Sequence, residues 1–423
     1  MILWKHQKAL LDLNPKKYLI AHTMGVGKTL TSIRLVEQNQ QQGGAIYKCL
    51  VVCPKSLKEQ WIANIPELLV NKEFAKAYTV MSKEEFKKWV LETDKPEKYS
   101  RLIVDEVHTF AGMTLNPKQD SMLFKTMDAY IKYAKPEYIY LLTGTPYTSS
   151  PLSILSYGIF LGRDIIQPNW NRWTFRKQFL YSFKIGMRRV YQPKKDIAES
   201  MNKLINIIGN TVKLEDTLGD LSMPEQIYTV KYFSLTKEQK DSVAGLTEEG
   251  IARWSRQLQV ESGTLKSDGY TDNQFFKSEK LDYVKQLLGI YTKFVIVCKF
   301  NLEIDMIKKE IKDHKVFVIN GKIKDKYQTC KDAEATKGKA VVLIQGQTSL
   351  GYELPSYSPM IFYSRDFSLT NNEQVVKRIL RRNKLKRNLY INLVIDDKKS
   401  IDHHVYKNIF IRKRDFQLKL YEN

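Results

Sequence analysis

The sequence predicts an α/β protein with two tandem units, each a parallel sheet flanked by helices, joined by a helical insertion. A length of 423 residues is too great for one ordinary core and suits two units of this class. Strand and helix patterns alternate up to about residue 150, and the alternation returns from about residue 226. The two halves share this architecture but not their sequence, because no internal repeat connects them.

Short apolar runs predict the strands of the first unit. They cover residues 18–21, 49–53, 101–104 and 138–142. Residues 151–222 instead hold aromatic-rich helical stretches, so we interpret them as a helical insertion or connector. The strand patterns of the second unit cover residues 226–230, 294–298, 316–319 and 340–344. The predicted division is therefore 1–150, 151–222 and 223–395, followed by a basic C-terminal helix over 396–423.

The charge of the chain indicates a polyanionic partner. Its 68 lysine and arginine residues against 46 acidic residues give a formal net charge of +22, although excess lysine can also serve solubility alone. The four cysteines lack the spacing of a metal site and are typical of reduced core residues: Cys49, Cys53, Cys298 and Cys330. The sequence shows no signal peptide and no apolar stretch long enough to cross a membrane, so we expect a cytoplasmic or host-cell interior location.

The segment from His22 to Thr29, His-Thr-Met-Gly-Val-Gly-Lys-Thr, predicts a phosphate-binding loop. Gly25 and Gly27 let backbone N–H groups turn inward at the start of a helix, where they can surround phosphate oxygens. Lys28 would reach the β- and γ-phosphates of ATP, and the Thr29 hydroxyl would complete the coordination of Mg²⁺. His22 stands where the general motif has glycine, and an ordinary glycine turn is the alternative for this segment taken alone.

Two adjacent carboxylates further along the chain complete the predicted site. Asp105 and Glu106 follow a buried-strand pattern, which puts them at the carboxyl edge of the sheet beside the loop. Asp105 is the predicted Mg²⁺ ligand, and Glu106 is the candidate general base that deprotonates the attacking water. A solvated acidic pair at a strand end is the alternative, but the combination with the loop favours a site that hydrolyses ATP.

Taken in order, the motifs resemble those of superfamily 2 helicase-type motors, and within them those of SWI/SNF-type DNA translocases. The loop resembles that family's Asp-Glu-Met-Gly-Leu-Gly-Lys-Thr version, which also lacks the first glycine. Residues 4–7, Trp-Lys-His-Gln, resemble the motif in which a glutamine, here Gln7, contacts adenine. The resemblance covers nearly the whole chain and implies two RecA-like domains that use ATP and Mg²⁺.

Two segments of the first unit resemble motifs that contact nucleic acid. The stretch Val-Val-Cys-Pro-Lys-Ser-Leu is similar to the motif that contacts the backbone, which implies that Lys55 and Ser56 bind phosphates. The stretch Thr-Gly-Thr-Pro is similar to the motif that couples hydrolysis to strand contacts, which implies that Thr143 and Thr145 bind nucleic acid. We expect His108, just after the two carboxylates, to take part in the same coupling.

In the second unit, residues 374–382 match the family's last motif, a glutamine followed by two arginines. The match implies that Gln374 binds the nucleotide and that Arg378 and Arg381 approach the γ-phosphate. A spacing of three puts both arginines on one face of a predicted helix. Guanidinium groups placed in this way raise the rate of other phosphoryl transfers by about 10³–10⁵-fold. A solvated basic helix face is the alternative, and residues 349–354 match their motif less well.

An aromatic cluster in the predicted insertion has two interpretations. Its members could stack on nucleobases, but their helical spacing favours a place in the core: Trp170, Trp173, Phe175 and Phe179.

We therefore expect a compact, monomeric, ATP-dependent motor whose track is duplex or branched DNA in preference to single strands or RNA. By analogy with the family, it would remodel forks or junctions, migrate branches, or act on recombination and repair intermediates. Two alternatives stay open. One is a strand-separating DNA or RNA helicase with the same ATP site, and the other is a nucleic-acid-binding protein with a weak ATPase. We expect no membrane partner.

Overall fold

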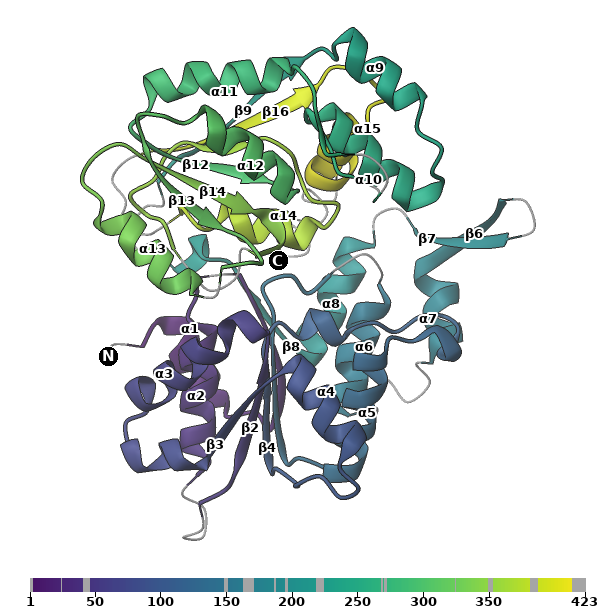
Figure 1. Cartoon of the computed structure of the whole chain (residues 1–423). Helices are drawn as coiled ribbons and strands as arrows, with labels where there is room; N and C mark the ends of the chain where they lie inside the picture. The colour runs from purple at the N-terminus through teal and green to yellow at the C-terminus, as the bar shows by residue number, and fades with distance from the viewer. Residues whose placement is uncertain are drawn as a thin grey trace. The chain divides into compact units, whose positions relative to one another are not determined.

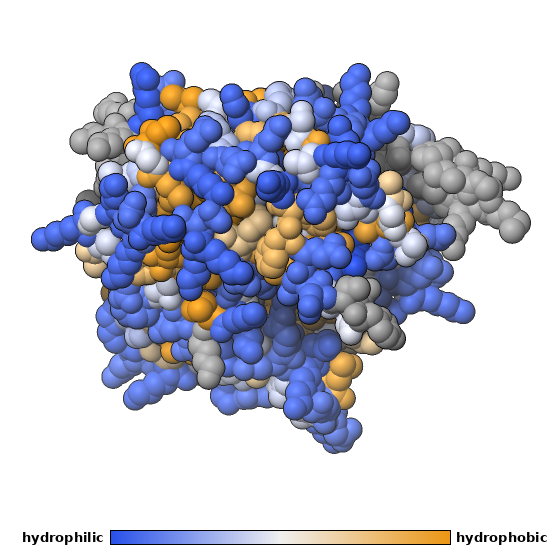
Figure 2. All heavy atoms as spheres, turned by 45° about the horizontal axis from the view of Figure 1, so that its top comes forward, coloured by the Kyte–Doolittle hydropathy of each residue, from blue (hydrophilic) through white to orange (hydrophobic). Residues whose placement is uncertain are grey.

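A computed structural model shows two compact units, over Met1–Gly219 and Asp220–Asp415, and each has its own sheet and core (Figure 1). The structure describes residues 3–23, 25–40, 46–147, 151–162, 171–185, 188–194, 197–217, 224–267, 269, 272–323, 325–348, 353–380 and 387–412. Hydrophilic side chains cover much of the face shown in Figure 2, in keeping with the 68 lysine and arginine residues. The predicted fold of two parallel sheets flanked by helices is confirmed.

The first unit contains a sheet of six parallel strands in the order β3-β2-β4-β5-β1-β8. The strands are β1 (Lys17–His22), β2 (Cys49–Cys53), β3 (Tyr78–Ser82), β4 (Arg101–Val104), β5 (Tyr138–Leu142) and β8 (Gly209–Val212). The central strands β2, β4 and β5 are buried along their whole length, because helices cover both faces of the sheet.

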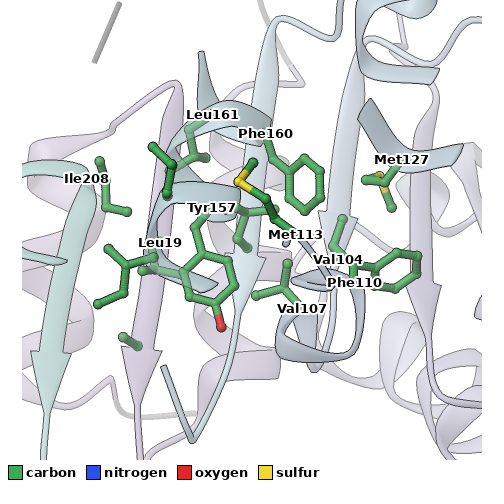
Figure 3. Packing of buried hydrophobic residues seen from close by; sticks show 14 of the residues in the cluster. Leu19, Val104, Val107, Phe110, Met113, Met127, Tyr157, Phe160, Leu161 and Ile208 are labelled. Atoms are coloured by element: carbon green, nitrogen blue, oxygen red, sulfur yellow. The ribbon is translucent and has the colours of Figure 1, made fainter. Parts of the chain in front are cut away.

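Alternate residues of these strands belong to two cores, one on each face of the sheet. Leu102 and Val104 of β4 pack into one core, whereas Ile103 packs into the other. Figure 3 shows the first of these cores, where Tyr157 and Phe160 lie among side chains from the sheet. The helices of this unit are α1 (Lys5–Leu13), α2 (Lys28–Gln38), α3 (Lys58–Leu68), α4 (Lys83–Glu92), α5 (Met122–Ala134), α6 (Leu152–Leu161), α7 (Arg172–Phe179) and α8 (Ala198–Ile208).

Much of the segment 151–222, predicted as a helical insertion or connector, lies within the first unit. Helices α6 and α8 pack into its core, and β8 pairs in parallel with β1. Gly209 opens β8, and a Cβ atom at this position would collide with the backbone carbonyl of Leu19. Helix α7 and the antiparallel hairpin that follows it do not belong to the six-stranded sheet. The hairpin consists of β6 (Leu180–Ile185) and β7 (Arg188–Pro193), and it extends away from α6 and α8 (Figure 1).

The second unit repeats the architecture with six parallel strands in the order β13-β14-β12-β15-β16-β9. These are β9 (Gln226–Phe233), β12 (Lys293–Cys298), β13 (Lys315–Ile319), β14 (Ala340–Gln345), β15 (Met360–Phe362) and β16 (Asn388–Ile395). The second unit also contains a separate antiparallel pair of short strands, β10 (Thr264–Leu265) and β11 (Gln274–Phe275). Its helices are α9 (Lys237–Ala244), α10 (Gly250–Glu261), α11 (Glu279–Ile290), α12 (Asn301–Glu310), α13 (Lys326–Ala335), α14 (Leu369–Val376) and α15 (Ile401–His404).

The predicted basic C-terminal helix over 396–423 corresponds in part to α15 and to a π-helical turn over Val405–Arg412. Ile401 and Val405 pack against Leu258 of α10, and Phe410 packs into the core of the second unit. Within the described residues, every helix is too short or too polar to cross a membrane.

Candidate nucleotide site

The loop between β1 and α2 has the backbone of a phosphate-binding turn. Gly25 and Gly27 adopt φ angles of 85° and 79°, in the left-handed region that favours glycine. A Cβ atom at Gly27 would also collide with the amide of Gln7. Gly27 directly precedes α2 and its carbonyl accepts the N–H of Thr31. The N–H groups of a first helical turn have no intrahelical acceptor, so this turn suits an anion.

Lys28 lies over the loop that precedes it. Its Nζ donates hydrogen bonds to the carbonyls of His22 at 2.9 Å and Thr23 at 3.3 Å. The neighbouring Thr29 is half-buried in the first turn of α2. The ammonium group and the hydroxyl of the predicted site therefore start the same helix.

Asp105 lies buried at the carboxyl end of β4. Its backbone N–H donates to Val52, and its carboxylate accepts hydrogen bonds from the Trp61 indole at 2.8 Å and from the Glu106 N–H at 2.9 Å. Burial and the neighbouring Glu106 raise the pKa of Asp105 to about 6, while Trp61 and the charge of Lys28 lower it. The charge of Lys28 therefore acts on the Asp105 carboxylate.

Glu106 starts a chain of polar contacts to the loop after β5. Its Oε2 lies 3.2 Å from His108 Nδ1, and the same nitrogen lies 3.3 Å from Thr143 Oγ1 and 3.4 Å from Thr145 Oγ1. The N–H of Thr145 donates to Thr143 Oγ1 at 3.1 Å. Glu106 itself has a φ of 47°, a left-handed conformation that is uncommon for a residue with a side chain and typical of functional turns.

The burial of these two threonines changes the expectation for them. Thr143 is 0 % exposed and Thr145 is 7 % exposed. A direct contact with nucleic acid requires an accessible side chain, so their observed contacts favour a role beside Glu106 instead. By contrast, Lys55 and Ser56 are exposed in a short 3₁₀ turn (Lys55–Leu57) that follows β2. A phosphate group of a nucleic-acid backbone can reach both side chains there.

His22 connects the phosphate-binding loop to the edge strand β8 through a side-chain contact. The Nε2 of this buried ring lies 2.9 Å from Asn210 Oδ1, and the ring packs edge-on against His6 at a centroid distance of 5.4 Å. His6 in turn contacts the carbonyl of Val26 at 3.1 Å. Burial lowers the pKa of His22 to about 3, so the ring is neutral at physiological pH.

This neutrality predicts a pH dependence of stability. Between its ordinary pKa of 6.5 and about 3, the unfolded chain protonates His22 while the folded chain does not, so stability falls as the pH falls through this window. At pH 4 the loss attributable to His22 would be at most about 3 kcal/mol. We expect His22→Gln to show a smaller drop in unfolding free energy between pH 7 and pH 4 than the wild type.

Urea unfolding followed by tryptophan fluorescence measures this difference. Five of the six tryptophans lie in the first unit, at positions 4, 61, 89, 170 and 173, so the signal reports mainly on that unit. Equal pH dependence in the two proteins would show that His22 does not carry the effect.

Gln7 contacts the loop from α1. It is buried, its Oε1 accepts the N–H of Trp4 at 2.9 Å, and its Nε2 points at the carbonyl of Gly27 at 3.5 Å. A hollow of about 290 Å³ in the first unit is lined by Leu3, Leu30, Arg34, Glu67, Leu68, Leu69, Val70 and Lys72. Gln7 is not among these residues, so the contact of Gln7 with adenine stays a prediction.

The predicted helix around the two arginines ends earlier than expected. Gln374 lies buried in α14, but this helix ends at Val376, and Arg378 lies in the turn that follows. We predicted that Arg378 and Arg381 lie on one face of a helix. This is wrong, because Arg378 lies outside the helix. Arg381 and the weak motif at 349–352 lie outside the described residues.

Arg378 is only 5 % exposed in the second unit, and its carbonyl accepts the N–H of Leu354 at 2.8 Å. Burial raises the pKa of the Cys330 thiol to about 12, and the charge of Arg378 lowers it, which places the guanidinium near α13. The surrounding fold therefore fixes the position of this guanidinium.

The donor set in the first unit fits Mg²⁺ and ATP. Among the described residues there is no cluster of three or more His, Cys, Asp or Glu that could enclose a metal. Mg²⁺ with a nucleotide does not need such a cage, because it usually keeps one or two protein ligands together with phosphate oxygens and waters. The Thr29 hydroxyl and the Asp105 carboxylate are the groups that would hold it.

Comparisons with known proteins found one matching family model and similar solved structures. Residues 3–148 match the family model described as "Type III restriction enzyme, res subunit", and this stretch contains every predicted site residue of the first unit. No curated protein matches the chain. Among solved structures, the chain is similar to the Sulfolobus solfataricus SWI2/SNF2 ATPase core in complex with dsDNA. The sequence identity is 16 % and the TM-score 0.41, over 93 % of this chain and 88 % of that chain.

Proposed function

We propose that this chain is a DNA-dependent ATPase of the superfamily 2 helicase type, similar to SWI/SNF translocases, and that it moves along duplex or branched DNA. The observation that carries the proposal is the convergence of Lys28, Asp105 and Glu106 at one edge of the first sheet. A second buried carboxylate beside the first is expected of a site that activates water, so it favours hydrolysis over binding alone.

Each group has a distinct task in this proposal. Lys28 neutralises the β- and γ-phosphates, and Thr29 and Asp105 hold Mg²⁺, which neutralises phosphate charge when bound. Glu106 orients and deprotonates the attacking water. The contacts from Glu106 through His108 to Thr143 and Thr145 connect this base to the loop after β5, so we propose that they couple hydrolysis to movement.

The charge of the chain supports a nucleic-acid track. A net charge of +22 favours contacts to phosphates, which give binding that depends strongly on salt and little on base sequence. The exposed Lys55 and Ser56 are the proposed first-unit contacts to the backbone.

We propose that Arg378 supplies positive charge to the phosphoryl transfer and that Gln374 belongs to the same nucleotide contact. Arg378→Ala should leave the dissociation constant of ATP nearly unchanged and lower the stimulated turnover by about 10³-fold or more. Nucleotide binding by equilibrium titration and turnover by phosphate release measure the two effects. The neighbouring Lys377→Ala should change turnover much less, and equal effects of the two variants would leave Arg378 with a structural role only.

ATPase rates measured in parallel test the function itself. The protein is assayed alone and with single-stranded DNA, blunt duplex DNA, forked or four-way DNA, and RNA, at one fixed salt concentration. We expect the largest stimulation by duplex or branched DNA. Stimulation by RNA or single strands alone would favour a strand-separating helicase, and the absence of any stimulation would favour a binding protein with a weak ATPase.

A further inference from the structure

The aromatic cluster of the predicted insertion separates into a buried part and an exposed part. Phe175 and Phe179 of α7 are 0 % and 3 % exposed, and they pack into the core of the first unit. Trp173 on the same helix is 64 % exposed. Trp170 lies outside the described residues. The core interpretation therefore holds for the two phenylalanines and fails for Trp173.

Helix α7 is held firmly, so the position of Trp173 is defined. Arg172 donates two hydrogen bonds to the carboxylate of Asp120, at 2.8 Å and 2.6 Å, and a third to the carbonyl of Thr114 at 2.6 Å. Asn171 caps the helix by accepting the N–H groups of Trp173 and Thr174. These contacts fix the first turn, from which the indole extends.

A guanidinium group covers part of the Trp173 ring. The Arg176 Cζ lies 4.2 Å from the ring centroid of Trp173, and Arg176 Nη1 donates to the Tyr191 hydroxyl of β7 at 3.2 Å. The same guanidinium lies 5.6 Å from the ring centroid of Tyr191. Arg176 therefore connects the exposed Trp173 ring to Tyr191 of the hairpin, and we call these three residues the stacking platform.

The segment that carries the platform is strongly basic. Residues 171–194 contain seven lysine and arginine residues and no acidic residue. An exposed tryptophan beside such a charge is the combination that binds single-stranded nucleic acid, since the charge attracts the backbone and the ring offers a face to a base. A protein partner would instead be expected to find an extended apolar patch.

We propose that the stacking platform binds an unpaired nucleobase of the DNA track. Bases inside a duplex are stacked on both faces, whereas an unpaired base along the track can offer a free face to the Trp173 ring. The inference rests on the proposed function and deepens it, because it selects DNA with unpaired bases, such as a fork or junction, from the tracks considered above.

Binding measured without nucleotide tests the platform separately from hydrolysis. Fluorescence anisotropy compares a blunt duplex with the same duplex carrying a single-stranded tail. Trp173→Ala should weaken binding of the tailed DNA by about 5- to 150-fold, the range for loss of one stacked base. Binding of the blunt duplex should stay within about twofold, and Trp173→Phe should restore part of the affinity for the tailed DNA. Trp254→Ala, at a 46 % exposed tryptophan of the second unit, is the matched control and should bind as the wild type does.

The outcomes distinguish the platform from the proposed function. If Trp173→Ala binds the tailed DNA as tightly as the wild type, or loses affinity equally for tailed and blunt DNA, the proposed role of the platform is wrong. In either case, intact duplex-stimulated ATPase would leave the proposed function standing. If the wild type neither binds DNA nor is stimulated by it, both are wrong.

Discussion

Replacing Glu106 with glutamine is expected to lower nucleic-acid-stimulated ATP hydrolysis by about 10²–10⁴-fold, the usual contribution of a positioned general base. Glutamine keeps the size of the side chain and can still contact His108, but it cannot accept the proton of the attacking water. ATP binding should persist, because Lys28, Thr29 and the loop glycines are unchanged. Turnover by phosphate release and affinity by titration with a fluorescent ATP analogue measure the two effects.

Glu84→Gln serves as the control for this variant. Its side chain is exposed on α4, and the substitution removes one carboxylate without touching the site. It should hydrolyse ATP at the wild-type rate. If Glu106→Gln kept its stimulated turnover within about threefold of the wild type, Glu106 would not be the general base.

Replacing Lys28 with alanine should weaken ATP binding and lower the rate of hydrolysis together. Its ammonium group is the predicted partner of the β- and γ-phosphates, and loss of one such charge costs about 10²–10³-fold in rate. The variant also removes the charge that lowers the pKa of Asp105, so that pKa should rise further and weaken the binding of Mg²⁺. This pattern differs from that of Glu106→Gln, which should spare binding.

Lys16→Ala is the matched control for this lysine. Lys16 is exposed just before β1, and its ammonium group pairs with Glu137 at 2.9 Å on the surface. Its loss should leave ATP affinity unchanged. Wild-type affinity in Lys28→Ala would mean that the loop after β1 does not bind phosphates.

The sequence was sufficient to predict the two sheets and the loop because those features depend on local patterns. Gly25, Gly27 and Lys28 lie within one turn of chain, directly between a strand and a helix, and the required backbone angles are properties of the glycines themselves. The pairing of Asp105 with this loop followed from the rule that the carboxyl ends of parallel strands meet at one edge.

Features that depend on distant contacts could not be predicted in this way. The indole of Trp61 positions Asp105 although the two residues are far apart in sequence. Strand β8 is short and polar, and it forms because Gly209 allows close approach to β1. Helix α14 ends at Val376 without glycine or proline, since the next turn buries Ile379 and offers the carbonyl of Arg378 to Leu354.

The exposure of the Trp173 side chain also could not be predicted from the sequence. Helical spacing places Trp173, Phe175 and Phe179 on the same short helix, but only the packing of α7 against the first unit decides which rings are buried. The basic composition of residues 171–194 was a usable signal, because a core helix and its hairpin have no need of seven positive charges.

Triplex displacement tests the central claim, movement along duplex DNA, most directly. A labelled third strand is bound in the groove of a duplex, and its release is followed with ATP, without ATP, and with Glu106→Gln. We expect ATP-dependent release of the third strand by the wild type only, while both duplex strands stay paired. Release of a duplex strand with the third strand left in place, or no ATP-dependent release at all, would contradict it.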